Sequence, residues 1–278
     1  MTQLQLPDVT LVCVDTRTPE LALDAIQHSM AQVQFRRVML FTDPLAIAGL
    51  PVGIDGVAVT IDSIAAYSTF MLRGLLPYVT TPHVLVVQWD GYVLDAGQWD
   101  PSFLQYDYIG ALLHGFPANR MVGNGGFSLR SRRLLEAMQD PEMAIGSPED
   151  TCICHTNRER LEAVHDIRIA PSDIAARFSY ERIMSPGATF GFHGLFNMHK
   201  VMSSQALDTL VRRLPDQLTH GVDARDLCRT LIETGELETA GVLLNKRRSL
   251  GPLHGRTLRL RWQHSFARIH HMMRRRVD

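Results

Sequence analysis

Cysteine is scarce in this chain, and its spacing excludes two common cysteine-based architectures. There are four cysteines among 278 residues, and none of their spacings is that of a zinc site. Cys152 and Cys154 form a C-x-C pair at a predicted helix start, which is unfavourable for a disulfide. The N-terminus shows no signal peptide, so we expect reduced thiols and a cytoplasmic protein.

Long apolar runs and dinucleotide-binding glycines are also missing. No apolar run approaches the roughly 20 residues of a membrane span, so the sequence predicts a protein that is soluble or peripheral at the inner face of the membrane. The turn after the first predicted strand reads DTRT (15–18). It lacks G-x-G-x-x-G, which disfavours a Rossmann oxidoreductase or methyltransferase.

Charge is divided unevenly along the chain. Residues 1–198 carry 13 Lys and Arg against 21 Asp and Glu, whereas residues 199–278 carry 15 against 8. The C-terminal part is therefore predicted to face an anionic partner, with a solvated basic tail as the alternative. Nucleic acid is not expected as that partner, because no recognised binding motif is present and the larger part is acidic.

The order of apolar segments predicts an α/β fold. Over the first 90 residues, buried parallel strands alternate with helices, which gives a doubly wound sheet with ligand sites at the carboxyl ends of its strands. The strands are predicted at 9–14, 37–41, 57–61 and 84–88, and the helices between them at 18–33 and 63–76. Further on we expect strands at 106–111 and 167–170 and helices at 131–139 and 148–164. We predict one Rossmann-type domain with a mixed central sheet over residues 1–198.

The remaining residues, 199–278, are predicted to form a basic α-helical extension. Its helices are expected at 203–214, 223–234, 236–246 and 256–276. The last helix carries an apolar stripe: Leu258, Trp262, Phe266, Ile269 and Met273. Such an amphipathic basic helix suits an anionic membrane surface, and packing of the stripe on the protein's own helices is the alternative.

A carboxylate follows the most apolar strand, in the segment VLVVQWDG. Asp90 stands where a divalent cation, Mn²⁺ or Mg²⁺, would meet the diphosphate of a nucleotide. Most enzymes that bind a nucleotide diphosphate through such a cation carry two acids at this place, as D-x-D. Here Gln88 occupies the first position, so only Asp90 can ligate the cation directly; we still expect a metal-dependent transferase of hexosyl groups. A strand-end acid that only caps a turn is the alternative.

A glycine-rich turn and a pair of acids come next. Gly123 to Gly126 can approach a ligand closely or can form a tight hairpin turn. Transfer of a sugar with inversion needs a base to deprotonate the acceptor hydroxyl. We assign that role to Asp150, supported by Glu149, although acids at a helix start can also be simple caps. A lone histidine between glycines, His193, is predicted to complete the metal site, with a structural histidine as the alternative. The residues expected to bind the donor are Thr16, Arg17, Asp43, Arg73, Gln88, Trp89, Asn124, Gly125 and Gly126.

Six segments together resemble a bacterial domain family of unknown function whose members are regarded as glycosyltransferases: LLPYVTTPHVLVVQWDGYVL, YDYIGA, VGNGGFSLRS, PEDTCIC, IAARFSYE and FGFHG. The resemblance covers about residues 8–198. It implies a GT-A fold and nucleotide-sugar chemistry, with Asp90 at the metal-site acid, the glycine turn at the donor and acceptor loop, and Asp150 at the base.

These observations predict an inverting glycosyltransferase. Its donor would be a nucleotide sugar, with UDP expected as the nucleotide, and its acceptor a hydroxyl of a cell-surface glycan or a lipid-linked glycan precursor. The alternative is a catalytically silent nucleotide- or sugar-binding scaffold in a glycan-assembly complex.

Overall fold

The computed structural model describes residues 3–250 and 255–274. The chain divides into two compact units, Met1–His193 and Gly194–Asp278, whereas the sequence analysis placed the division after Met198. Within the described residues, no helix combines the length and the apolar character that crossing a membrane requires.

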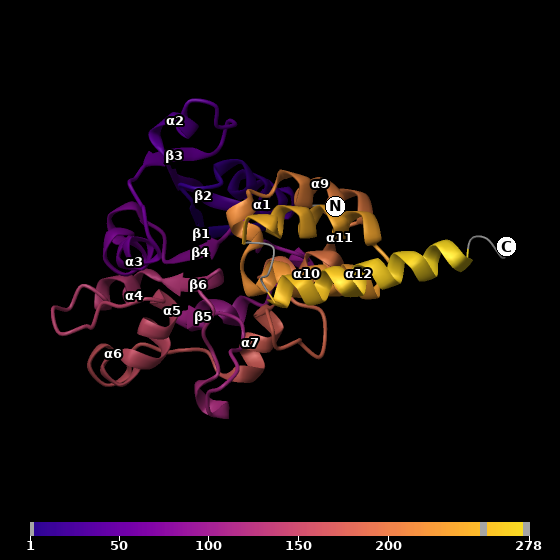
Figure 1. The fold of residues 1–278 in the computed structure, drawn as a ribbon. Helices are drawn as coiled ribbons and strands as arrows, with labels where there is room; N and C mark the ends of the chain where they lie inside the picture. Colours follow the sequence, from indigo (N-terminus) through magenta and orange to yellow (C-terminus); the bar gives the residue numbers. More distant parts are fainter. Residues whose placement is uncertain (1–2, 251–254, 275–278) are drawn as a thin grey trace. The chain divides into compact units, whose positions relative to one another are not determined.

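The first unit is built around a mixed six-stranded sheet with the order β3-β2-β1-β4-β6-β5. The first four strands of the chain pair in parallel, and β6 is antiparallel to β4 and to β5 (Figure 1). Their bounds are β1 Leu4–Val14, β2 Val33–Thr42, β3 Asp55–Ala58, β4 His83–Val87, β5 Tyr108–Ile109 and β6 Phe127–Ser131. This arrangement confirms the predicted α/β class with a mixed central sheet.

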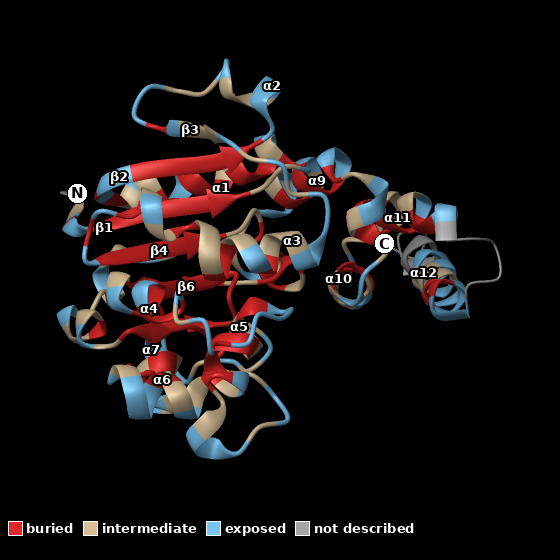
Figure 2. Ribbon diagram, turned by 90° about the vertical axis from the view of Figure 1, so that its left-hand side faces the viewer, coloured by how far each residue is buried: buried red, intermediate tan, exposed pale blue. Residues whose placement is uncertain are grey.

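The central strands are buried on both faces, which explains why they read as continuous apolar runs. Successive residues of β4 alternate between two apolar clusters: Leu85 and Val87 belong to one, and Val84 and Val86 to the other. Figure 2 shows β1, β2, β4 and β6 as buried along most of their length. Helices and loops of this unit pack on the sheet; the helices are α1 Pro19–Gln32, α2 Pro44–Ile47, α3 Ile64–Thr69, α4 Arg132–Ala137, α5 Glu149–Thr151, α6 Arg158–His165 and α7 Ser172–Phe178.

Three predictions for this unit are wrong in detail. The helix expected at 63–76 is α-helical only at Ile64–Thr69 and continues as a π-helical turn at Phe70–Gly74. The helix expected at 148–164 is interrupted: α5 passes into a π-helical turn at Cys152–Thr156, and α6 begins only after Asn157. The backbone N–H of Asn157 donates to the carbonyl of Cys152 at 3.0 Å, and its side chain bonds the backbone of Ala144. Because the side chain of Asn157 is bonded to the loop residue Ala144, the regular series of i to i−4 helical hydrogen bonds does not continue through Asn157. The strand expected at 167–170 is a single bridge from Tyr108 to Ile169.

The second unit is helical, as the sequence predicts. Its helices are α8 Met198–Val201, α9 Ser204–Arg213, α10 Val222–Glu233, α11 Leu237–Lys246 and α12 Gly255–Arg274. Helix α11 contacts α9 and α10, and α12 contacts both α10 and α11. The predicted end of the last helix, at 275–276, lies outside the described residues.

Candidate functional site

Two segments distant in sequence meet beyond the carboxyl end of β4. The chain after β4 runs beside the segment that includes β8 (Gly191–Phe192): Val93 forms a bridge with Gly191, and the N–H of Leu94 donates to the carbonyl of Phe190 at 2.8 Å. β8 pairs in turn with β7 (Ser179–Tyr180), and the N–H of His193 donates to the carbonyl of Tyr180 at 3.0 Å. These backbone bonds place His193 next to Gln88 and Asp90.

His193 is the centre of the cluster. Its Nε2 lies 3.1 Å from Oε1 of Gln88 and 3.3 Å from Oδ1 of Asp90. Its Nδ1 lies 3.1 Å from the amide of Asn124 and 3.7 Å from Oε1 of Glu181. Burial alone would lower the pKa of His193, but the charge of Asp90 and the hydrogen bonds to Asp90 and Glu181 raise that pKa to about 10. The two carboxylates on either side of the imidazole thus favour its protonated form.

A protonated Nδ1 needs an acceptor, and the amide of Asn124 can supply one. Among the described residues, Oδ1 of Asn124 is buried without a hydrogen-bond partner, and its Nδ2 is the atom placed against His193. Amide orientations follow from the hydrogen-bond network, and rotating this amide by half a turn places an acceptor at Nδ1 of His193.

The structure gives a reason for Gln88 at the first position of the motif. Its Nε2 donates to the hydroxyl of Tyr67 at 3.0 Å, while its Oε1 faces His193. Burial raises the pKa of Tyr67, so the hydroxyl stays protonated and accepts this bond. A carboxylate has no N–H and could not donate to Tyr67 in this way. Gln88 thus joins Tyr67 to His193 and still presents an oxygen to the site.

In the glycine turn, the glycines provide space for neighbouring side chains and do not adopt the positive φ expected of them. The residue with a left-handed backbone is Asn124 (φ 57°), a conformation that asparagine tolerates. The following glycines supply space instead: a Cβ on Gly125 would lie 2.1 Å from Oε1 of Glu149, and one on Gly126 would lie 2.1 Å from Nε2 of His193. These two glycines therefore allow the turn to pack directly against both side chains.

Asp150 and Glu149 have separate environments. Asp150 is partly exposed, and its Oδ2 accepts the N–H of Gly125 at 3.0 Å. Glu149 is buried and forms an ion pair with buried Arg130, Oε1 to Nη2, at 2.9 Å. The same guanidinium reaches the carbonyl of Gly125 at 3.4 Å. The glycine turn is thus held from one side by Asp150 and from the other by Arg130.

The donor atoms around Nε2 of His193 suit a divalent cation. A carboxylate oxygen of Asp90 lies 3.3 Å and an amide oxygen of Gln88 lies 3.1 Å from Nε2 of His193. Hard oxygen ligands with imidazole are what Mn²⁺ accepts. Glu181 and Asn124, at Nδ1, stand where partners that orient a ligating histidine are found. Within the described residues, no group of three or more His, Cys, Asp and Glu side chains is placed to hold a metal ion, so the site offers only His193, Asp90 and the amide oxygen of Gln88. Such a cation would take its other ligands from the substrate.

The other predicted donor residues lie elsewhere or serve local structure. Thr16 and Asp43 follow β1 and β2 at the same edge of the sheet, where Thr16 donates to the carbonyl of Ile61 and Asp43 caps α2. Arg17 is in the same turn as Thr16. Arg73 donates to the carbonyls of Asp140 and Met143, in the loop before α5. Trp89 is half-buried beside Asp90.

Sequence reasoning missed three residues of the cluster: Tyr67, Arg130 and Glu181. Arg130 occupies a strand position two residues after Ser128, to whose hydroxyl its Nε donates at 3.0 Å. An arginine among apolar strand residues signals a buried ion pair, because an unpaired buried charge is costly. Nothing in the local sequence identifies Tyr67 or Glu181, which reach the site only through the tertiary fold.

Comparison with solved structures gives remote matches. The bifunctional IspDF from Campylobacter jejuni matches with a TM-score of 0.38 and 10% identity, over 52% of this chain and 46% of that one. A glycosyltransferase involved in the glycosylation of the major capsid of PBCV-1 matches with a TM-score of 0.41 and 11% identity, over 66% of this chain and 91% of that one. The chain thus spans less than half the length of the IspDF protein, and similarity at this level carries no argument about activity.

No curated protein matches this sequence. A family model described as "Protein of unknown function (DUF5672)" matches residues 57–193. The matched span includes every side chain of the cluster around His193, from Tyr67 to His193 itself.

Proposed function

We propose that this chain is an inverting glycosyltransferase of GT-A type, with a UDP-sugar as donor. The observation that carries the proposal is the convergence of Asp90, Gln88 and His193 with the turn that holds Asp150. These groups sit beyond the carboxyl end of a central parallel strand, where open α/β sheets bind their ligands. Strand β6 is antiparallel to β4, and the glycine turn directly before β6 contacts both His193 and Asp150.

In this proposal, Asp90, Gln88 and His193 would hold Mn²⁺ or Mg²⁺ at the diphosphate of the donor. The cation would neutralise the charge that develops on the leaving diphosphate. Asp150 takes the proton of an acceptor hydroxyl, whose oxygen bonds to the anomeric carbon as the bond from that carbon to the diphosphate oxygen breaks. The nucleoside diphosphate leaves with both bonding electrons, and the anomeric configuration inverts.

The acceptor is proposed to be a hydroxyl of a cell-surface glycan or its lipid-linked precursor. One observation favours the second candidate, a silent binding scaffold: both oxygens of Asp150 already accept backbone N–H groups, from Gly125 and from Thr151 at 2.6 Å. Oδ1 also accepts from the hydroxyl of Thr151 at 3.4 Å, whereas Oδ2 accepts one bond and keeps its second lone pair for an acceptor hydroxyl. We therefore retain the catalytic role.

The variant Asp150→Asn tests whether the chain is a glycosyltransferase or a silent binding scaffold. The amide keeps the shape of the side chain but cannot take up a proton, so transfer or hydrolysis of UDP-sugars should fall by a factor of roughly 10² to 10⁴, with donor affinity retained. Turnover is measured by release of UDP, and donor binding by calorimetry. Glu159→Gln, an exposed change on α6, is the matched control. Unchanged turnover in Asp150→Asn would move the base to Glu149 or to another residue. Binding without any turnover in the unmodified protein would favour the scaffold.

A further inference from the structure

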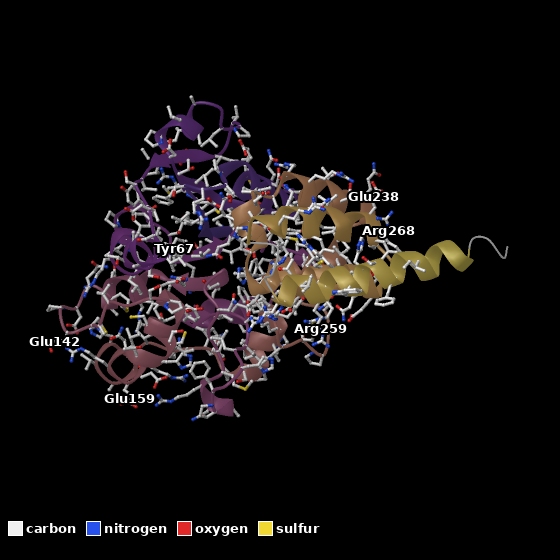
Figure 3. All side chains as sticks on the ribbon, in the orientation of Figure 1. Tyr67, Glu142, Glu159, Glu238, Arg259 and Arg268 are labelled. Carbon is white, nitrogen blue, oxygen red and sulfur yellow. The ribbon has the colours of Figure 1, made fainter. Side chains whose placement is uncertain are left out.

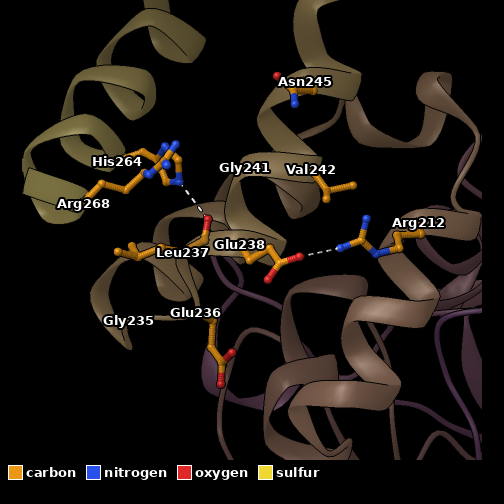
Figure 4. Close-up of a pocket in the computed structure, with 10 residues that line it drawn as sticks. All are labelled: Arg212, Gly235, Glu236, Leu237, Glu238, Gly241, Val242, Asn245, His264 and Arg268. Carbon is orange, nitrogen blue, oxygen red and sulfur yellow. Dashed lines mark hydrogen bonds and ion pairs between the residues drawn. The ribbon is translucent and has the colours of Figure 1, made fainter. Parts of the chain in front are cut away.

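Helix α12 packs on its neighbours through one face only. Thr257 and Leu260 are buried, and Nε2 of His264 bonds the carbonyl of Leu237 in α11 at 2.7 Å. A groove of about 730 Å³ lies between α11 and α12 on this side (Figure 4). The packed face therefore consists of small, polar and aliphatic side chains, not of the apolar stripe that the sequence showed.

The stripe itself faces away from α10 and α11. We define the α12 stripe as its four described members, whose exposed fractions are 38% for Leu258, 61% for Trp262, 65% for Phe266 and 46% for Ile269. The rings of Trp262 and Phe266 stack with centroids 6.2 Å apart. The alternative that this stripe packs on the protein's own helices does not hold within the second unit. The side chain of Met273 lies outside the described part.

The charge around the stripe is of one sign. The sequence of α12 contains five arginines and no acid. Arg256, Arg259 and Arg268 are exposed, and Figure 3 labels the last two on α12. The one acid of α11, Glu238, lines the groove and pairs with Arg212 at 3.2 Å. The stripe thus has a basic border that no acid of α12 offsets.

We propose that α12 docks on the surface of an anionic lipid bilayer. An exposed row of Trp, Phe, Leu and Ile bordered by arginines is the composition of helices that lie in the membrane interface, with the rings among the acyl chains and the guanidinium groups at the phosphates. A second copy of α12 is the less suitable occupant, because two such helices would bring arginines against arginines. The inference stands independently of sugar transfer.

Co-sedimentation of the full chain with vesicles tests this proposal. The protein should pellet with phosphatidylcholine vesicles that contain phosphatidylglycerol, and should stay in solution with phosphatidylcholine alone. Arg256→Gln, Arg259→Gln and Arg268→Gln together should weaken partitioning by a factor on the order of a hundred, since each basic residue contributes about fivefold. Trp262→Ser with Phe266→Ser should weaken it by at least about tenfold.

The matched control is Leu45→Ser on α2, because Leu45 is also a fully exposed apolar residue, at 92%. That variant should bind vesicles as the unmodified protein does. Circular dichroism and sedimentation velocity on each variant report its fold and its oligomeric state. The proposal is overturned by absence of binding to anionic vesicles, by binding that the Trp262 and Phe266 changes leave intact, or by a dimer that those changes convert to a monomer without any vesicle binding.

Discussion

Gly126 is the residue whose replacement tests the site with the least chemical change. In Gly126→Ala the new Cβ would lie 2.1 Å from Nε2 of His193. The imidazole must therefore move away from Asp90 and Gln88. We expect the contribution of Mn²⁺ to UDP affinity, measured by calorimetry, to fall at least about tenfold, a loss of roughly 1.4 kcal/mol.

Gly187→Ala provides the control for Gly126→Ala. Gly187 is exposed, and a Cβ there meets no atom within 4 Å. Its variant should keep the metal-dependent affinity. If Gly126→Ala also kept it, His193 would have no part in cation binding.

The ion pair between Arg130 and Glu149 contributes to the stability of the fold, and we assign it no part in the reaction. Arg130→Met leaves the carboxylate of Glu149 buried and unpaired, so the free energy of unfolding should fall by about 3–5 kcal/mol. Adding Glu149→Leu should recover most of this loss, because a buried pair can be replaced by apolar side chains of similar volume. Urea unfolding measures both changes.

An exposed pair of the same unit gives the comparison. Arg120 and Glu159 lie 3.2 Å apart with 37% and 82% of their side chains exposed. Arg120→Met should cost at most about 1 kcal/mol, the usual range for surface pairs. Equal losses at Arg120 and Arg130 would mean that Glu149 is not left as an isolated buried charge.

At the scale of elements, the loop between α4 and α5 fixes the position of Asp150. Asp140 holds the start of this loop: its Oδ2 accepts from Arg160 and lies 2.9 Å from Nε2 of His165. The backbone N–H of Glu142 and the bonds from His165 and Arg160 lower the pKa of Asp140 to about 2.

Asp140→Asn should therefore destabilise the protein in a pH-dependent way. The pKa of this carboxyl is lower in the folded state than its ordinary value of about 3.9, so the stabilisation is complete above about pH 4 and is lost as pH falls through about 2. The difference in unfolding midpoint between the unmodified protein and Asp140→Asn should be constant near neutral pH and shrink below pH 4. A difference that grew on acidification would contradict the assignment.

The elements that the sequence predicted well are those with a regular burial pattern, either buried throughout or buried along one helical face. The run at 84–87 is apolar at every position because β4 is covered on both faces, and α9 to α11 follow from regular helical spacing. The interruption after α5 could not be predicted, because it depends on Asn157 bonding to Ala144 across a loop. Local propensity favours an unbroken helix there, and tertiary hydrogen bonds override it.

At the scale of the whole molecule, the site is assembled from segments that span residues 67–193. The sequence could identify Asp90, Asn124 and His193 as one group, because strand ends and glycine-rich turns gather at one edge of an α/β sheet. It could not show that Glu149 points to Arg130 rather than to a substrate. Adjacent acids at a helix start look alike in sequence, and only the fold separates a buried ion pair from a partly exposed carboxylate.

Ligand binding to this site should stabilise the native chain by mass action. At a concentration of UDP about a hundred times its Kd, the free energy of unfolding should rise by roughly 2.7 kcal/mol, and Mn²⁺ should enlarge the shift in unfolding temperature. Asp90→Asn should remove the enlargement by Mn²⁺, while Trp262→Ser on α12 should leave it unchanged. A scan of unfolding by fluorescence, with UDP, with Mn²⁺ and with both, measures these terms separately. An equal response to Mn²⁺ in the Asp90→Asn variant would place the cation away from the end of β4, and no response to UDP in any combination would remove the basis for a UDP-sugar donor.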